Sequence, residues 1–266
     1  MFRLKLASCM AENTESFCHA LAQYIDDQLG VPVEYVSGIP WQERERLFDR
    51  GEIDLIWICG LPYARKSDSA MNDLELLAVP VPAGERYRSR PVYFSDVVVR
   101  RDSAYHTFVD LRGTRWAFNE PLSHSGFNVV RAYLAEFGQF DGYFGAVIES
   151  GAHSASMAMI LSGAVDGTAI DSTVLEWMIS EREELARQIR VIDTFGPSPI
   201  PPWVVSRRVP CELAESLRRA LIEMDRLEPG QAILQSARLE RFVPAQDADY
   251  DPIRRMARKA ESVLLA

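Results

Sequence analysis

Apolar residues along this chain follow two spacings in turn, one typical of strands and one typical of helices. Near the start, a strand-like alternation is followed by Phe17, Leu21 and Ile25, which share one face of a helix that Gly30 can end. A later run, "IDLIWI", is apolar throughout, as expected for a strand buried on both faces of a parallel sheet. This order predicts a doubly wound sheet with right-handed crossovers. The predicted elements are a strand at 2–8, a helix at 12–29, a strand at 31–37, a helix at 41–51 and a strand at 53–58.

The same alternation restarts in the middle of the chain. Two long strand-like stretches, "LELLAVPV" and "PVYFSDVVVRRDS", precede it, and an extended, proline-rich segment leads from it to two or three final helices. The segment "CGLPYA", which follows the third strand, is predicted to be a loop. The elements predicted for this second series are strands at 115–119, 145–150, 167–171 and 189–194, with helices at 125–137, 152–162 and 173–179.

The two series predict an α/β fold of two lobes, each with a doubly wound sheet flanked by helices. The final helices have no strands of their own to cover, so they are expected to return to the first series. Lobe one is therefore predicted at 1–95 plus 196–266 and lobe two at 96–195, joined by two crossing hinge segments near 94–99 and 199–205. A ligand is expected in the cleft between the lobes, at the carboxyl ends of strands.

Size and charge narrow the classes of partner. A chain of 266 residues suits two lobes of about 100–150 residues each. The net charge of −9 argues against nucleic acid and anionic membrane surfaces, which attract basic proteins. No apolar run approaches the roughly 20 residues of a membrane span. The first ten residues lack the apolar core of a signal peptide, so the protein is periplasmic if a signal peptide was trimmed and cytoplasmic if Met1 is the true start.

Common catalytic and metal-binding signatures are missing from the sequence. It contains no Walker loop, GxGxxG, HExxH or GxSxG motif. The four cysteines form no CxxC pair and have no zinc spacing, which favours free thiols and leaves a Cys9–Cys59 pairing as the open alternative. We therefore expect no catalytic residue, no metal and no cofactor.

The segment "NEPLSHSGFNVV", residues 119–130, places turn-forming and hydroxyl residues directly before an apolar helix. Ser123 or Ser125 can cap that helix, and Gly126 allows another group to approach the backbone closely. The start of a helix also has unpaired N–H groups and a partial positive charge, which suit an anion. Taken alone, the segment fits either an ordinary helix cap or an anion-binding site.

Five segments together resemble a known protein family. They are "GEIDLIWICGLPYARKSD", "YFSDVVVRRDS", "DLRGTRWAFNEPLSHSGF", "ESGAHSASMAMILSGAVDGTAIDS" and "PIPPWVVSRR". In this order and spacing they resemble the phosphonate-, phosphite- and phosphate-binding substrate-binding proteins of ABC importers, over nearly the whole chain. The resemblance implies the two-lobed periplasmic-binding fold, a small oxyanion ligand and an ABC permease as partner, without catalysis.

The resemblance also implies a set of ligand-binding residues. The turn that binds phosphonate oxygens in the family corresponds to Ser123, His124, Ser125 and Gly126, with His124 at a position where the family usually has threonine. Hydroxyl and N–H groups suit a dianion, because they donate hydrogen bonds without burying several full charges. His124 could add a cationic donor or simply point to solvent, and the sequence leaves both alternatives open.

Three further residues correspond to ligand contacts of the family. His153 matches a histidine before a second helix, Asp171 an aspartate that receives the ligand's amino or hydroxyl group, and Tyr93 a tyrosine in a crossing strand. Each residue also has a purely structural interpretation, respectively as a buried histidine, a helix cap and a packing aromatic side chain.

Three functions are compatible with these features. The favoured one is a solute-binding protein that captures a small oxyanion of the phosphonate, phosphite or phosphate class for an ABC-type importer. The alternatives are a cytoplasmic enzyme on the same two-lobed fold and a ligand sensor. The sequence leaves the identity of the ligand and the oligomeric state open.

Overall fold

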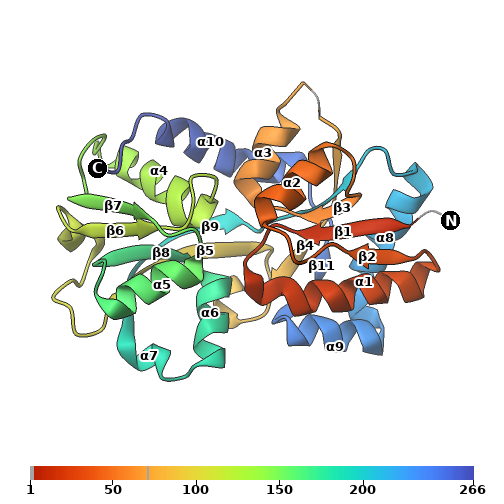
Figure 1. Ribbon diagram of the computed structural model, residues 1–266, viewed down its shortest axis with the longest axis horizontal. Coiled ribbons are helices and arrows are strands. Elements are labelled where there is room, and N and C mark those ends of the chain that lie inside the picture. The colour runs from red at the N-terminus through yellow and green to blue at the C-terminus, as the bar shows by residue number, and fades with distance from the viewer. Residues whose placement is uncertain (1–2, 71) are drawn as a thin grey trace. The chain divides into compact units, whose positions relative to one another are not determined.

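The computed structural model describes residues 3–70 and 72–266, and it confirms an α/β fold with two sheets. The chain forms two compact units, both drawn in Figure 1. Unit 1 comprises residues 3–92 and 199–251, and unit 2 comprises residues 93–198 and 252–266.

The chain passes from one unit to the other at three places. The first two passages, after Val92 and after Ser198, lie close to the predicted crossing segments. The third passage, after Asp251, was not predicted. The sequence therefore indicated the insertion of unit 2 into unit 1, but not the return of the chain to unit 2.

Unit 1 is built on a six-stranded sheet. Its elements are β1 (Leu4–Ser8), α1 (Glu15–Leu29), β2 (Val33–Tyr35), α2 (Trp41–Asp49), β3 (Leu55–Trp57), α3 (Gly60–Ser67), β4 (Leu74–Pro82), β10 (Trp203–Ser206), α8 (Cys211–Ile222), α9 (Glu228–Ser236) and β11 (Leu239–Val243). The strand order is β11-β4-β10-β3-β1-β2. β1 pairs in parallel with β2 and β3, whereas β10 is antiparallel to both β3 and β4.

The main apolar core of unit 1 lies between this sheet and three helices. Leu21 of α1, Leu217 of α8 and Leu234 of α9 are buried in one cluster with Leu6 of β1. Burying a leucine side chain contributes about 1.5–3 kcal/mol relative to leaving it exposed. The other face of the sheet carries α2 and α3 (Figure 1). The helically spaced apolar residues of α1 therefore pack against the sheet, as predicted.

Unit 2 is built on a five-stranded sheet with the order β7-β6-β8-β5-β9. Its elements are β5 (Val92–Arg100), β6 (Arg115–Phe118), α4 (Val129–Glu136), β7 (Ala146–Glu149), α5 (His153–Ser162), β8 (Gly167–Asp171), α6 (Ser172–Glu181), α7 (Leu185–Gln188), β9 (Ile189–Pro199) and α10 (Asp251–Ala260). β6 is parallel to β7 and β8, and β5 is antiparallel to β8. We call the edge where β6, β7 and β8 end the carboxyl edge of unit 2, and the edge where they begin the amino edge.

The last helix, α10, belongs to unit 2 and not, as predicted, to lobe one. Arg131 of α4 donates a hydrogen bond to the Val263 carbonyl at 2.9 Å, and Lys259 of α10 forms an ion pair of 2.6 Å with Glu136 of α4. Met256 and Val263 pack into the apolar cluster of unit 2. Figure 1 shows α10 and α4 side by side. Helix spacing alone does not specify which sheet a helix covers, so the sequence could not make this assignment.

Two other elements differ from the prediction. The segment "CGLPYA" is the start of helix α3 and not a loop. Pro62 is tolerated there because it stands in the first turn, where a missing N–H removes no helical hydrogen bond. β11 was missed, although it pairs antiparallel with β4. Two residues separate it from the end of α9, and its five residues have no clear strand pattern.

Within the described ranges, no helix is both long enough and apolar enough to cross a membrane. The same ranges contain no disulfide between the four cysteines. They also contain no cluster of three or more histidine, cysteine, aspartate or glutamate side chains that could hold a metal ion.

Candidate functional site

The turn at residues 123–128 lies at the carboxyl edge of unit 2, a few residues after β6. Ser123 is the N-cap, and its Oγ accepts a hydrogen bond of 3.1 Å from the N–H of Gly126. The turn is π-helical, because the N–H of Asn128 donates to the Ser123 carbonyl at 3.0 Å, and it continues into α4. The structure thus confirms Ser123 as the cap, which leaves Ser125 available for another role.

Ser125 and His153 bring the starts of two helices together. Ser125 Oγ lies 3.2 Å from His153 Nε2, and both residues are more than nine-tenths buried. His153 is the first residue of α5, whose N-cap, Ala152, gives the helix no side-chain cap. Both helix starts direct N–H groups and a partial positive charge to this edge of the sheet. The sequence predicted both residues, and the structure places them in contact.

Asn119 packs against the same turn, although the sequence interpretation did not include it in the site. A Cβ atom at Gly126 would lie 2.0 Å from Asn119 Oδ1, so this packing requires a glycine at that position. Among the described residues, Asn119 Oδ1 and His153 Nδ1 are buried without a hydrogen-bond partner. Such atoms are rare in folded proteins, and they mark a place where a polar ligand can gain hydrogen bonds. The available sequence signal was a polar residue at the end of a buried strand.

His124 does not point to solvent, which was one of the two alternatives. Its side chain is fully buried in unit 2, where Nε2 lies 2.9 Å from Ser198 Oγ and Nδ1 lies 3.1 Å from Asn128 Nδ2. Burial lowers the pKa of His124 to about 3, so the imidazole is neutral near pH 7. The other alternative, a cationic donor, therefore does not describe this state of the protein.

His153 is also neutral near pH 7. Burial lowers the pKa of its imidazole to about 4. A neutral imidazole has one N–H donor and one acceptor nitrogen, so His153 can exchange a hydrogen bond with Ser125 and offer its second nitrogen to a ligand. This part of the carboxyl edge thus offers hydroxyl, imidazole and backbone N–H groups without a full positive charge.

Asp171 ends β8 at the same edge and caps α6. Its Oδ1 accepts hydrogen bonds from the N–H of Thr173 at 2.8 Å and from Thr173 Oγ1 at 2.7 Å. Burial raises the pKa of Asp171 to about 6, and the charge of Asp96 adds to the rise. The structure therefore supports the interpretation of Asp171 as a helix cap, and a role in ligand binding stays a prediction.

Tyr93 is buried at the start of unit 2, with 1% of its surface exposed. Its ring packs edge-on against the His124 ring, at a centroid distance of 6.4 Å. On the same strand, Ser95 Oγ donates a hydrogen bond of 2.6 Å to the Ser125 carbonyl. β5 thus supports the turn at residues 123–128, and a contact of Tyr93 with a ligand stays a prediction.

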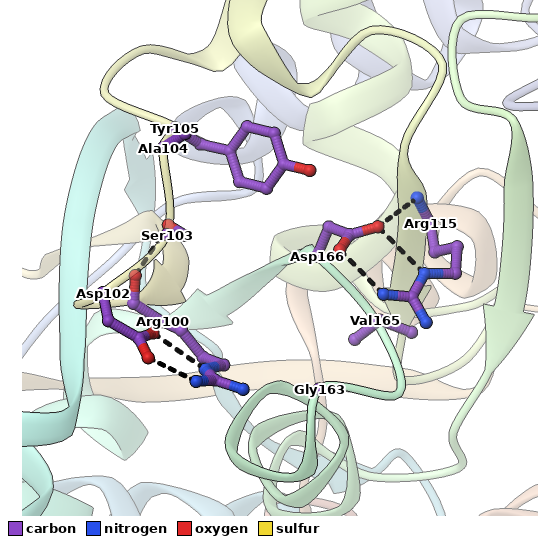
Figure 2. Close-up of a pocket in the computed structure, with 9 residues that line it drawn as sticks. All are labelled: Arg100, Asp102, Ser103, Ala104, Tyr105, Arg115, Gly163, Val165 and Asp166. Carbon is purple, nitrogen blue, oxygen red and sulfur yellow. Dashed lines mark hydrogen bonds and ion pairs between the residues drawn. The ribbon is translucent and has the colours of Figure 1, made fainter.

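A pocket of about 320 Å³ lies at the amino edge of unit 2, away from these residues (Figure 2). Two ion pairs line it: Arg100 with Asp102, and Arg115 with Asp166, whose Nη2 and Oδ1 atoms are 2.9 Å apart. The four charges cancel within the pocket. α5 ends there at Gly163, and the carboxyl end of a helix disfavours anions. This pocket is therefore a poor site for an oxyanion.

The carboxyl edge has the chemistry that the pocket lacks. Two helix starts, a pair of contacting polar side chains and two buried polar atoms without partners among the described residues suit a small anion. Together with the two α/β units, they are typical of substrate-binding proteins. Comparison with known proteins identifies the family within this class. The family model described as "ABC transporter, phosphonate, periplasmic substrate-binding protein" matches residues 8–250, and the chain belongs to this family.

Individual relatives are distant in sequence but share the fold. A probable ABC transporter phosphite-binding protein, PhnD1 of Prochlorococcus marinus (strain MIT 9301), is 21% identical over 248 residues, which cover 90% of this chain and 82% of the relative. The structure of PhnD1 from this organism in complex with methylphosphonate matches with a TM-score of 0.85 and 19% identity, over 98% of this chain and 99% of that chain. A binding protein component of a phosphonate ABC transporter from Pseudomonas aeruginosa matches with a TM-score of 0.84 and 19% identity, over 98% and 87% of the two chains.

Membership in this family confirms the family that the sequence resembled. It also confirms a substrate-binding component of a transporter as the function, in place of an enzyme. The ligand-binding residues and the identity of the ligand require an argument from the site itself.

Proposed function

We propose that this chain captures a small phosphonate or a related oxyanion, such as phosphite or phosphate, at the carboxyl edge of unit 2. Ser123 and Ser125 bind the oxyanion together with the N–H groups of the π-turn, which include that of His124. Gly126, whose own N–H donates to Ser123 Oγ, allows the oxyanion to approach the backbone closely. His153 binds it from the start of α5. Tyr93 and Asp171 are the two further residues of this proposed site.

The contact between Ser125 and His153 carries the proposal. It joins the starts of two helices at a distance of 3.2 Å, next to two buried atoms, Asn119 Oδ1 and His153 Nδ1, that have no partner among the described residues. A hydrogen bond to a charged group contributes about 1.5–3 kcal/mol, so a few such donors account for tight binding. An ordinary capped helix would not need this arrangement.

The ligand class comes from the family and its relatives. The family is described by phosphonate, one relative is named as a probable phosphite-binding protein, and the structure of PhnD1 contains methylphosphonate. These ligands share a tetrahedral phosphorus centre with several acceptor oxygens, which matches a site built from hydrogen-bond donors. We therefore infer an ABC permease as the partner that receives the ligand, and the periplasm as the compartment.

Calorimetric titration with methylphosphonate, phosphite, phosphate and methanesulfonate tests this function. We expect the parent protein to bind at least one of the phosphorus oxyanions. Ser125→Ala and His153→Ala should each weaken that binding about ten- to a hundredfold, since about 1.4 kcal/mol corresponds to a factor of ten. Because Ser123, and not Ser125, caps the helix, Ser125→Ala leaves the cap in place.

Ser162→Ala is the matched control, since Ser162 is exposed at the opposite end of α5. It should bind the ligand like the parent protein. If Ser125→Ala and His153→Ala also bind like the parent, the proposed site is wrong. If the parent binds none of the oxyanions, the proposed ligand class is wrong.

A further inference from the structure

His124 stands between two proposed ligand-binding residues, yet its side chain turns into the interior of unit 2. It is fully buried, and both of its ring nitrogens lie within hydrogen-bond distance of a buried polar side chain. Two hydrogen bonds compensate the loss of hydration at the two buried ring nitrogens. The partners are Ser198 and Asn128, which lie on different segments of unit 2.

The proton positions on the His124 ring follow from its partners. Asn128 Nδ2 can only donate, so Nδ1, at 3.1 Å, is the acceptor. The neutral ring then carries its proton on Nε2, which donates to Ser198 Oγ at 2.9 Å. The lowered pKa agrees with this neutral form.

The partners of His124 lie on three different segments of unit 2. Asn128 closes the π-turn that contains Ser125. Ser198 is the last residue of unit 2 before the chain leaves it, and Tyr93, whose ring packs on His124, is the first residue after the chain enters it. One imidazole therefore contacts the turn and both strands at the points where the chain enters and leaves unit 2.

A second bond supports the same turn from β5. Ser95 Oγ donates to the Ser125 carbonyl at 2.6 Å, and Ser95 is buried. The turn is thus held by Ser95 from β5 and by Ser198, through His124, from β9. Donors that are held in place lose little conformational entropy when a ligand binds, and a shift of about 1 Å weakens their hydrogen bonds.

We propose that His124 is a positioning residue that ties the π-turn at residues 123–128 to Ser198 and Tyr93, and thereby holds Ser125 and the N–H groups of the turn in the geometry that binds the oxyanion. His124 does not touch the ligand through its side chain. This inference rests on the proposed function, because it concerns the same turn.

Two substitutions separate the two hydrogen bonds of the ring. In His124→Gln the amide nitrogen can take the place of Nε2 and keep the bond to Ser198. In His124→Asn the shorter amide can replace Nδ1 and keep the contact with Asn128, but it does not reach Ser198. We expect His124→Gln to bind the oxyanion within about threefold of the parent and His124→Asn to bind about tenfold more weakly, which is the effect of one lost hydrogen bond.

Ser198→Ala removes the hydrogen bond between His124 Nε2 and Ser198 Oγ by deleting the serine hydroxyl. It should weaken binding about as much as His124→Asn, and the double variant should be no weaker than either single variant, because two substitutions that break one interaction are not additive. Ligand affinity by calorimetry and the dissociation rate by stopped-flow are the measurements, with thermal denaturation recorded without ligand.

Thr168→Val is the control for a general loss of stability. Thr168 is fully buried in the same sheet, and its Oγ1 donates to the Ala117 carbonyl at 2.9 Å, so the variant loses one buried hydrogen bond that does not involve residues 123–128. It should lower the melting temperature and leave the affinity unchanged.

The outcomes separate this inference from the proposed function. If Ser125→Ala weakens binding but His124→Asn and His124→Gln bind alike, the positioning role is wrong and the site remains. Additive effects of His124→Asn and Ser198→Ala would also overturn the positioning role. If the parent protein binds no phosphorus oxyanion, the proposed function and this inference both fail.

Discussion

The two edges of the unit 2 sheet differ in the kind of positive charge that they carry. At the amino edge, the guanidinium groups of Arg100 and Arg115 are each paired with an aspartate of the same unit. At the carboxyl edge, His124 and His153 are neutral, and positive potential comes from two helix starts. Full charges that the chain itself neutralises are not available to a ligand. Partial charges at helix starts are available to a ligand. When the ligand dissociates from them, no full charge remains buried without a partner.

Adding one methyl group at each edge should give the largest contrast. Gly126→Ala places a Cβ atom 2.0 Å from Asn119 Oδ1, so the turn must shift. We expect a loss of oxyanion affinity of about a hundredfold or more and a loss of stability of about 1–3 kcal/mol, as for other overpacked sites. Calorimetry and thermal denaturation measure the two effects.

Gly163→Ala is the matched change at the amino edge. Gly163 has a φ of +74° and a Cβ there would lie 3.2 Å from Arg100 Nη1, so alanine is strained. It should cost about 1 kcal/mol of stability and leave the affinity unchanged. Equal affinities of Gly126→Ala and Gly163→Ala would show that the two edges do not differ in function.

The neutral histidines should make the protein sensitive to acid. The folded-state pKa values of His124 and His153 lie below the value of 6.5 of an unperturbed histidine, so the unfolded chain takes up protons first. Their contribution to stability is present above about pH 6.5 and decreases as the pH falls, by up to about 2 kcal/mol for each histidine near pH 5.

Urea denaturation at pH 7, 6 and 5 checks this, with His153→Gln as the comparison. The variant should show a smaller loss of stability between pH 7 and 5. The raised pKa of Asp171 acts in the opposite direction, because its contribution decreases as the pH rises toward 6. A parent protein with equal stability at pH 7 and pH 5 would contradict the buried neutral histidines.

Asp171 tests whether a carboxylate at the carboxyl edge affects the anion. Above about pH 6 it is ionised and repels an oxyanion, and below that pH it becomes neutral. Asp171→Asn should therefore bind methylphosphonate a few-fold more tightly than the parent at pH 7.5 and about equally at pH 5. Because both proteins meet the same ligand ionisation at a given pH, the ratio of their affinities does not depend on the titration of the ligand. A constant ratio between pH 5 and 7.5 would place Asp171 outside the site.

The smallest effect is expected at the ion pairs of the amino edge. Arg115→Gln breaks the pair with Asp166, which is exposed to solvent on the arginine side, so water and salt screen the attraction between the two charges. Stability should change little, and the oxyanion affinity should change less than twofold in calorimetry. An affinity loss of tenfold would make the pocket in Figure 2 part of the ligand site.

Much of the fold could be predicted from apolar spacing, because each sheet is covered by amphipathic helices. The prediction of α1, α2 and β3 depended on local pattern alone, and the structure contains all three. β11 and the assignment of α10 depend on pairing and packing between distant segments, which local pattern does not record. These two errors therefore concern information that is not local. The start of α3 was a local error, because its glycine and proline are also typical of loops.

The candidate site shows the same limit. Ser125 and His153 could be proposed from residue type, helix starts and family resemblance, and the structure places them in contact. The orientation of His124 and the packing of Asn119 on Gly126 could not be predicted, because each depends on a partner far away in the sequence or on the exact path of the turn. The type of a residue indicates which chemistry its side chain can perform, whereas the orientation of that side chain is known only from the folded structure.

The position of α10 has a consequence for how the polypeptide folds. Val97 and Trp116 share a buried cluster with Val263 and Leu265, so the core of unit 2 combines segments that are synthesised about 150 residues apart. During translation, unit 2 would expose apolar surface until its final helix emerged from the ribosome. A nascent chain stopped at residue 250 should therefore be bound by chaperones or cleaved by proteases within residues 93–198, and adding residues 251–266, which contain α10, Val263 and Leu265, should restore protease resistance.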